Sequence, residues 1–139
     1  MALVYFDASA LVKLVLPEPE NALAVALWNG CDLALSSRLV YSEVCAAVAA
    51  AHRNRRLDAA ELRRTLRRWD EYWIGIRPVE LSEEVAQQAG RLVEVHALRG
   101  ADGIHLASVL SLADADPVVS TWDRRLSVGA SAEGLRTVP

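Results

Sequence analysis

Apolar runs alternate with helical patterns along the whole chain of 139 residues. This alternation is typical of an α/β domain, in which helices connect the parallel strands of a central sheet. No repeat, low-complexity segment or linker interrupts the pattern, and 139 residues are close to the commonest size of one domain. We therefore expect a single α/β domain over residues 1–139, with a mostly parallel sheet of about five strands.

The local pattern predicts where the elements lie. We expect strands at residues 3–6, 32–36, 76–81, 118–120 and 135–138. We expect helices at residues 7–16, 20–29, 39–54, 58–72, 82–98 and 101–112, and one helical turn at 124–126. Gly30 is expected to cap the second helix in the left-handed conformation, and Gly100 to break the fifth. Ser37 is a predicted N-cap, and Asp58 with Glu61 predicts a capping box.

The ends and the cysteines indicate a soluble cytoplasmic protein. The apolar start of the chain runs straight into Asp7, which leaves it too short for a secretion signal. The longest apolar stretches fall well short of the roughly 20 residues that cross a bilayer, so no membrane contact is expected. In a reducing compartment we expect Cys31 and Cys45 to be small buried residues, not a disulfide.

The positive charge is concentrated in one region. A net charge of −3 by itself counts against binding a polyanion, but seven arginines fall between Arg53 and Arg68, while Lys13 is the only lysine. Side chains such as Arg53 and Arg56 could bind RNA phosphate. A solvated helix face with interleaved acids is the commoner explanation of such a pattern, and both interpretations stay open.

Four acids stand at predicted strand ends or helix starts. Asp7 follows the first strand, Asp123 follows the fourth, Asp102 opens the sixth helix, and Glu43 lies near the start of the third. The carboxyl ends of parallel strands form the binding crevice of an open sheet, so Asp7 and Asp123 should share one edge. Glu43 is the most telling of the four, because an almost wholly apolar Ala/Val stretch follows it.

A convergence of these acids would require a positive partner. Two carboxylates about 4 Å apart repel by roughly 4 kcal/mol at an effective dielectric near 20. A divalent cation or shared protons must relieve such a site, and an all-oxygen set favours Mg²⁺ or Mn²⁺ over zinc. The expected chemistry is metal-assisted hydrolysis of a phosphodiester, which needs no nucleophilic side chain.

Each candidate also has a purely structural interpretation. Asp7, Asp102 and Asp123 occupy ordinary capping positions, and Glu43 could be a solvated helical residue. Polar support for the acids is expected from Ser9 and Thr121, although either hydroxyl could simply bond its own backbone. His105, one turn beyond Asp102, could contact substrate phosphate or could be a hydrogen-bonded packing residue.

In their order and spacing, four segments resemble PIN-domain ribonucleases of the VapC toxin type: V-Y-F-D-A-S-A-L-V-K-L, S-E-V, A-D-G-I-H-L-A-S and V-V-S-T-W-D-R-R-L. The resemblance covers essentially the whole chain. It implies a three-layer α/β/α sandwich and an acidic metal-binding set of Asp7, Glu43, Asp102 and Asp123. It also implies a homodimer, an RNA substrate, and a VapB-type antitoxin that blocks the site in a heterotetramer or larger assembly.

Two positions depart from the family pattern without removing an acid. Gly103 stands where family members often carry a larger residue, and Leu126 stands where an aromatic is common. Two other enzyme classes fit less well. A receiver domain needs a late lysine, and a haloacid-dehalogenase-type phosphatase needs an acid where Ser9 stands. A non-catalytic PIN-like module that binds RNA or protein remains the alternative from another class.

An aromatic cluster and the acids themselves are the candidate partner contacts. Trp69, Tyr72 and Trp73 crowd the end of the arginine-rich helix, where they could receive a partner helix or form core. An acidic groove would also attract an arginine of the antitoxin.

Overall fold

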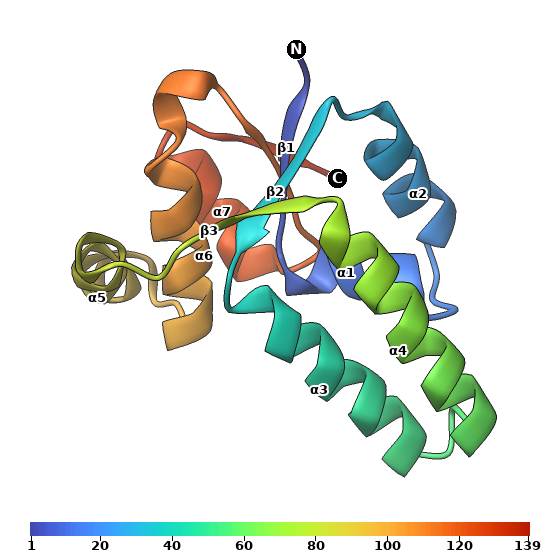
Figure 1. Cartoon of the computed structure of the whole chain (residues 1–139). Coiled ribbons are helices and arrows are strands. Elements are labelled where there is room, and N and C mark those ends of the chain that lie inside the picture. Colours follow the sequence, from blue (N-terminus) through green and yellow to red (C-terminus); the bar gives the residue numbers. More distant parts are fainter.

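Five parallel strands form the central sheet of the computed structural model, which describes residues 1–139 (Figure 1). Their order across the sheet is β3-β2-β1-β4-β5. The strands are β1 (Leu3–Phe6), β2 (Leu33–Ser37), β3 (Ile76–Val79), β4 (Val118–Ser120) and β5 (Arg136–Val138). The chain therefore moves outward from β1 on one side, returns, and continues on the other, which is the doubly wound arrangement that the alternating pattern predicts.

Helices cover both faces of the sheet. They are α1 (Ala8–Val15), α2 (Asn21–Gly30), α3 (Val40–Arg53), α4 (Ala59–Ile74), α5 (Glu83–His96), α6 (Gly100–Leu110) and α7 (Arg124–Ala132), with a short 3₁₀ turn at Ala113–Ala115. Residues of α1 to α4 pack in one hydrophobic cluster, and residues of α5 to α7 pack in another. Figure 1 shows these two groups on opposite sides of the strands, so the three-layer α/β/α fold is confirmed.

The central strand supplies both cores. In β1, Val4 and Phe6 face the cluster of α1 to α4, whereas Tyr5 faces the cluster of α5 to α7. Successive side chains of a strand point to opposite faces, and a strand covered on both faces must be apolar throughout. This is why β1 has no charged residue until Asp7, where the chain leaves the sheet, and why its one hydroxyl, on Tyr5, needs a buried partner.

Both glycine expectations are wrong. Gly30 is the last residue of α2, and the chain continues through an extended Cys31 because it enters β2 almost at once. Gly100 does not break a helix: it is the first residue of α6. The break lies earlier, at Ala97, which adopts the left-handed conformation with φ of 52°.

Three further local expectations are corrected. Ser37 is the last residue of β2 and not the N-cap of α3, although its hydroxyl accepts the Leu39 N–H at 3.1 Å. The last helix, α7, extends over nine residues instead of one turn, because it buries Leu126 and Ala130 in the second core. Cys31 and Cys45 are free thiols and are only partly buried. None of the helices combines the length and the apolar character needed to span a bilayer.

Candidate active site

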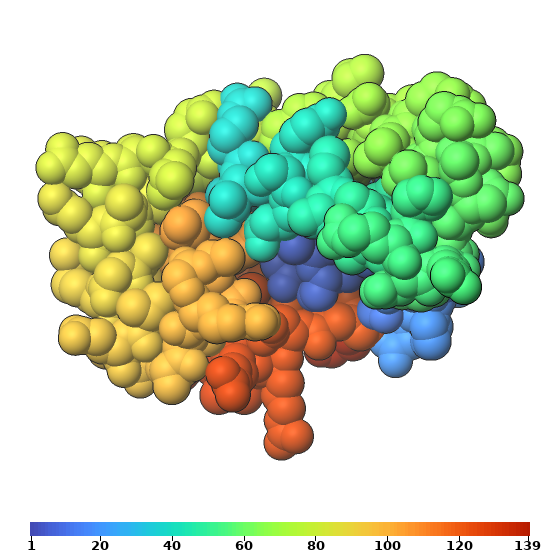
Figure 2. All heavy atoms as spheres, turned by 90° about the horizontal axis from the view of Figure 1, so that it is seen from below, coloured from blue at the N-terminus to red at the C-terminus, as the bar shows by residue number.

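The predicted acids gather around the edge of the sheet where the strands end. Asp7 follows β1 directly, and Asp123 lies three residues beyond the end of β4. Figure 2 views the molecule from this edge: dark-blue atoms of the early chain are recessed between α3 in teal, α6 in light orange and α7 in red-orange. The crossover connections on either side of β1 leave this recess open.

Asp7 forms the floor of the site. Its side chain is only 3% exposed and accepts hydrogen bonds from the hydroxyls of Ser9 at 2.7 Å and Thr121 at 2.6 Å. It also caps α1 by accepting the Ala10 N–H at 2.9 Å. Burial raises the pKa of the Asp7 carboxyl, and the nearby His105 ring and the hydrogen-bond donors oppose that rise. Asp7 is thus a buried carboxyl held in place from two strand ends.

Asp102 and Asp123 share one guanidinium. Arg99 lies 3.3 Å from Asp102 through Nε and 3.5 Å from Asp123 through Nη2. Its own side chain is 76% exposed, so this bridge is open to solvent. Asp123 also caps α7 by accepting the Leu126 N–H at 2.9 Å. The Thr121 hydroxyl accepts the Asp123 N–H at 3.0 Å, which joins this pair to Asp7.

Glu43 is held by a buried histidine. It lies in the first turn of α3, and its Oε1 is 2.6 Å from Nε2 of His105. The other ring nitrogen, Nδ1, is 2.9 Å from the hydroxyl of Tyr5. His105 is only 2% exposed with both nitrogens engaged, so it matches the packing interpretation and does not reach solvent to touch substrate.

Three of the four acids are therefore connected through shared partners, and Glu43 is connected to the helix that carries one of them. Thr121 links Asp7 to Asp123, and Arg99 links Asp123 to Asp102. Glu43 joins α6, the helix that carries Asp102, through His105. No three Asp, Glu, His or Cys side chains lie close enough together to hold a metal ion in this arrangement. We call the four acids together with Thr121, Arg99 and His105 the acid network.

The two arginines predicted to bind substrate lie away from the acid network. Glu43 is in the first turn of α3 and Arg53 is its last residue, a separation of ten positions or about 15 Å along the helix. Arg56 instead pairs with Glu18 at 3.6 Å. This geometry therefore does not favour a contact of Arg53 or Arg56 with RNA that is bound at the acids.

Sequence reasoning missed two residues of the site. Arg99 had a recognisable signal, because it precedes Asp102 by three positions, the spacing of neighbours on a helix face. Tyr5 had none beyond its place in an apolar strand, where its partner is one hundred positions away.

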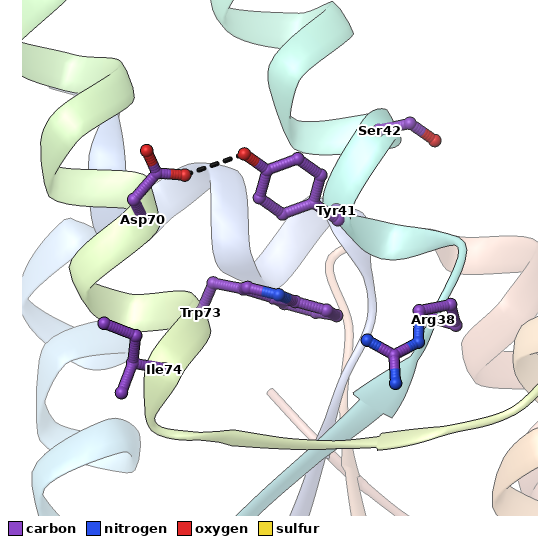
Figure 3. Close-up of a pocket in the computed structure, with 6 residues that line it drawn as sticks. All are labelled: Arg38, Tyr41, Ser42, Asp70, Trp73 and Ile74. Atoms are coloured by element: carbon purple, nitrogen blue, oxygen red, sulfur yellow. Dashed lines mark hydrogen bonds between the residues drawn. The ribbon is translucent and has the colours of Figure 1, made fainter.

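An aromatic cluster between α3 and α4 belongs to a different surface. A cleft of about 520 Å³ lies between the start of α3 and the end of α4, lined by Arg38, Tyr41, Ser42, Asp70, Trp73 and Ile74 (Figure 3). The hydroxyl of Tyr41 donates to Asp70 across it at 2.8 Å. Of the three aromatics predicted as core or interface, Trp69 is fully buried, whereas Tyr72 and Trp73 are half-buried.

The chain is similar to known proteins in sequence and in fold. The family model described as "PIN domain" matches residues 4–130. Ribonuclease VapC45 of Mycobacterium tuberculosis is 57% identical over 139 residues, which cover 100% of this chain and 96% of that protein. The fold is shared with PAE2754 from Pyrobaculum aerophilum, with a TM-score of 0.71, 20% identity, and coverage of 99% and 91% of the two chains. It is also shared with a toxin–antitoxin complex from Klebsiella pneumoniae, with a TM-score of 0.70, 17% identity, and coverage of 98% and 96%.

Proposed function

This chain belongs to the PIN-domain family and is of the VapC type, and from that membership we propose that it is a metal-dependent endoribonuclease toxin. The observation that carries the proposal is the acid network. Asp7, Asp123 and Asp102 are linked by shared partners at the carboxyl edge of the sheet, and Glu43 is bonded to the helix that carries Asp102. A purely structural set of helix caps would not need a buried carboxyl at its centre.

The chemistry of the four carboxylates suits a hard divalent ion, although the acids would have to move closer together to bind it. Asp7 keeps a carboxyl in a nearly solvent-free position where burial raises its pKa, so the structure disfavours its negative charge in the absence of a cation. Asp102 and Asp123 already lie on either side of a single positive group. We therefore propose Asp7, Glu43, Asp102 and Asp123 as the ligands of Mg²⁺ or Mn²⁺, with oxygen donors only. When bound, the ion would supply Lewis-acid chemistry, making a water nucleophilic and offsetting charge on the phosphoryl group.

The remaining residues keep the carboxylates in place. Ser9 and Thr121 fix the two oxygens of Asp7 separately, at Oδ1 and Oδ2. Ser9 also accepts the Trp122 N–H at 2.8 Å, which ties the turn after β4 to the start of α1. The position of the Asp7 carboxylate thus follows from two adjacent strand ends and not from a flexible loop.

Partners follow from the same membership. We propose RNA as the substrate, a VapB-type antitoxin as the inhibitor, and a homodimer that forms a heterotetramer or larger assembly with it, in the cytoplasm. The similar structure from Klebsiella pneumoniae, described as a toxin–antitoxin complex, supports the antitoxin. An arginine of the antitoxin would compete with Arg99 for Asp102 and Asp123, since a guanidinium pairs well with carboxylates.

RNA cleavage by the purified chain tests the function. We expect cleavage of RNA with Mg²⁺ or Mn²⁺, none with EDTA, and a loss of at least about 100-fold in Asp7→Asn, in keeping with the removal of a group that acts at the reacting centre. Asp114→Asn is the matched control, because Asp114 is an exposed acid in the 3₁₀ turn outside the acid network. A folded wild-type chain that binds RNA and leaves it intact would favour the alternative, a non-catalytic binding module.

A further inference from the structure

Tyr5 and His105 form a polar pair in an otherwise apolar core. Tyr5 is fully buried and His105 is 2% exposed, and Tyr5, with Leu106 and Ala107 beside His105, belongs to the cluster that α5 to α7 build on the sheet. The two rings meet edge to face, with centroids 5.9 Å apart. Burying a hydroxyl and an imidazole costs free energy unless both are hydrogen-bonded, so an apolar pair would serve packing alone at least as well.

The hydrogen bonds of the Tyr5–His105 pair continue to the carboxylate of Glu43. A carboxylate can only accept hydrogen bonds, so Nε2 of His105 carries the hydrogen that Glu43 Oε1 receives at 2.6 Å. In the neutral ring Nδ1 is then an acceptor, and it takes the O–H of Tyr5 at 2.9 Å. The tautomer of His105 is thereby set from the side opposite Glu43.

Apart from His105, few contacts restrain the side chain of Glu43. Its long side chain extends from a first helical turn whose N-cap, Leu39, provides no side-chain hydrogen bond. Oε1 accepts from His105, whereas Oε2 accepts no hydrogen bond from the protein, and the side chain is 25% exposed. Fixing a free glutamate in one rotamer costs side-chain conformational entropy, and a preformed hydrogen bond offsets this cost before any ligand arrives.

We propose that Tyr5 and His105 are positioning residues that hold the Glu43 carboxylate with Oε1 engaged and Oε2 directed to the open side. This inference rests on the proposed function, in which Glu43 binds a divalent ion. His105 does not touch substrate: it acts through Glu43, and Tyr5 acts through His105.

Calorimetric Mn²⁺ binding to the purified chain, without RNA, is the main test. We expect the double variant Tyr5→Phe with His105→Leu to bind Mn²⁺ about 10- to 100-fold more weakly, the usual effect of losing a group that orients a metal ligand. The two replacements are apolar and suit the surrounding core. His105→Gln places an N–H donor near the position of Nε2, so it should recover affinity to within a few-fold of the wild type.

Matched controls separate this effect from general damage. Tyr72→Phe removes a hydroxyl from a half-buried tyrosine of α4, and His52→Leu removes a histidine whose ring is hydrogen-bonded only to the Leu57 carbonyl. Both should bind Mn²⁺ as the wild type does. Urea unfolding of every variant shows which of them are folded at the temperature of the titration.

Ring-nitrogen NMR of the metal-free wild type tests the hydrogen-bond pattern even if the double variant fails to fold. We expect the Nε2–H tautomer at His105; an Nδ1–H tautomer would overturn the proposal. So would wild-type Mn²⁺ affinity in a folded double variant, with the nuclease function intact. A wild-type chain that neither binds Mn²⁺ nor cleaves RNA is a distinct result, because it removes the proposed function and this inference together.

Discussion

Thr121 donates its hydroxyl hydrogen to Asp7 over 2.6 Å, across 114 positions of sequence. The same oxygen accepts the N–H of Asp123, so one small side chain joins the acids that follow β1 and β4. Thr121 is 2% exposed, and water cannot replace either bond. The spacing of two proposed metal ligands therefore depends on a residue that holds no formal charge.

Replacing Thr121 by valine should destabilise the chain by about 1–3 kcal/mol, the usual cost of leaving buried polar partners unsatisfied. Valine keeps the shape, so the loss reports on the hydroxyl alone. Urea unfolding measures it. Thr137→Val is the control, because the Thr137 hydroxyl has only a long contact of 3.4 Å with Ser127. Equal stability of the two variants would show that the bond to Asp7 contributes nothing.

The buried carboxyl of Asp7 predicts an unusual pH dependence in EDTA. Burial raises the pKa of Asp7 in the folded state, so folding disfavours its ionised form. This penalty is absent below the unfolded pKa of about 3.9, develops as the pH rises from there through the raised native pKa, and stays constant above it. Asp7→Asn should therefore gain stability relative to the wild type as the pH rises. Urea unfolding over a pH series checks the sign: a wild type that gains on the variant with rising pH would contradict it.

Arg99 should weaken ion binding in the wild type. Arg99 forms ion pairs with both Asp102 and Asp123, so it competes with a cation for these carboxylates. Because the pairs are exposed, each contributes at most about 1 kcal/mol to stability. We expect Arg99→Gln to bind Mn²⁺ up to about tenfold more tightly, the equivalent of about 1.4 kcal/mol. Thermal unfolding should change little. Arg91→Gln, an exposed arginine of α5 without an ion pair, is the control for the loss of one positive charge. Weaker Mn²⁺ binding in Arg99→Gln would instead indicate that Arg99 organises the site.

Two glycines at neighbouring helices should respond oppositely to alanine. A Cβ at Gly103 in α6 would overlap Val93 Cγ1 and lie 3.1 Å from the Ala89 carbonyl oxygen, so Gly103→Ala should cost about 1–3 kcal/mol. A Cβ at Gly90 in α5 would meet nothing within 4 Å, so Gly90→Ala should stabilise by about 0.5–1 kcal/mol. Thermal unfolding of both variants distinguishes them. A neutral Gly103→Ala would mean that α5 and α6 separate easily.

The Gly103 contact also explains a departure from the family pattern. Val93 fills the space that a larger residue at position 103 would need, so α5 and α6 approach closely beside the acid network. The pattern of residues 100–110 contains the glycine but not its neighbour, because the neighbour belongs to another helix. Sequence reasoning could therefore record the departure without giving its cause.

By itself, the sequence determined the order of helices and strands, the parallel sheet and the strand-end positions of Asp7 and Asp123. These follow from local apolar periodicity and from the rule that parallel strands end at one edge. Only the tertiary structure decided that His105 is buried against Glu43 and that Arg99 bridges two acids. Those relationships join side chains on different elements, and they are set by how the helices pack on the sheet, which no local pattern encodes.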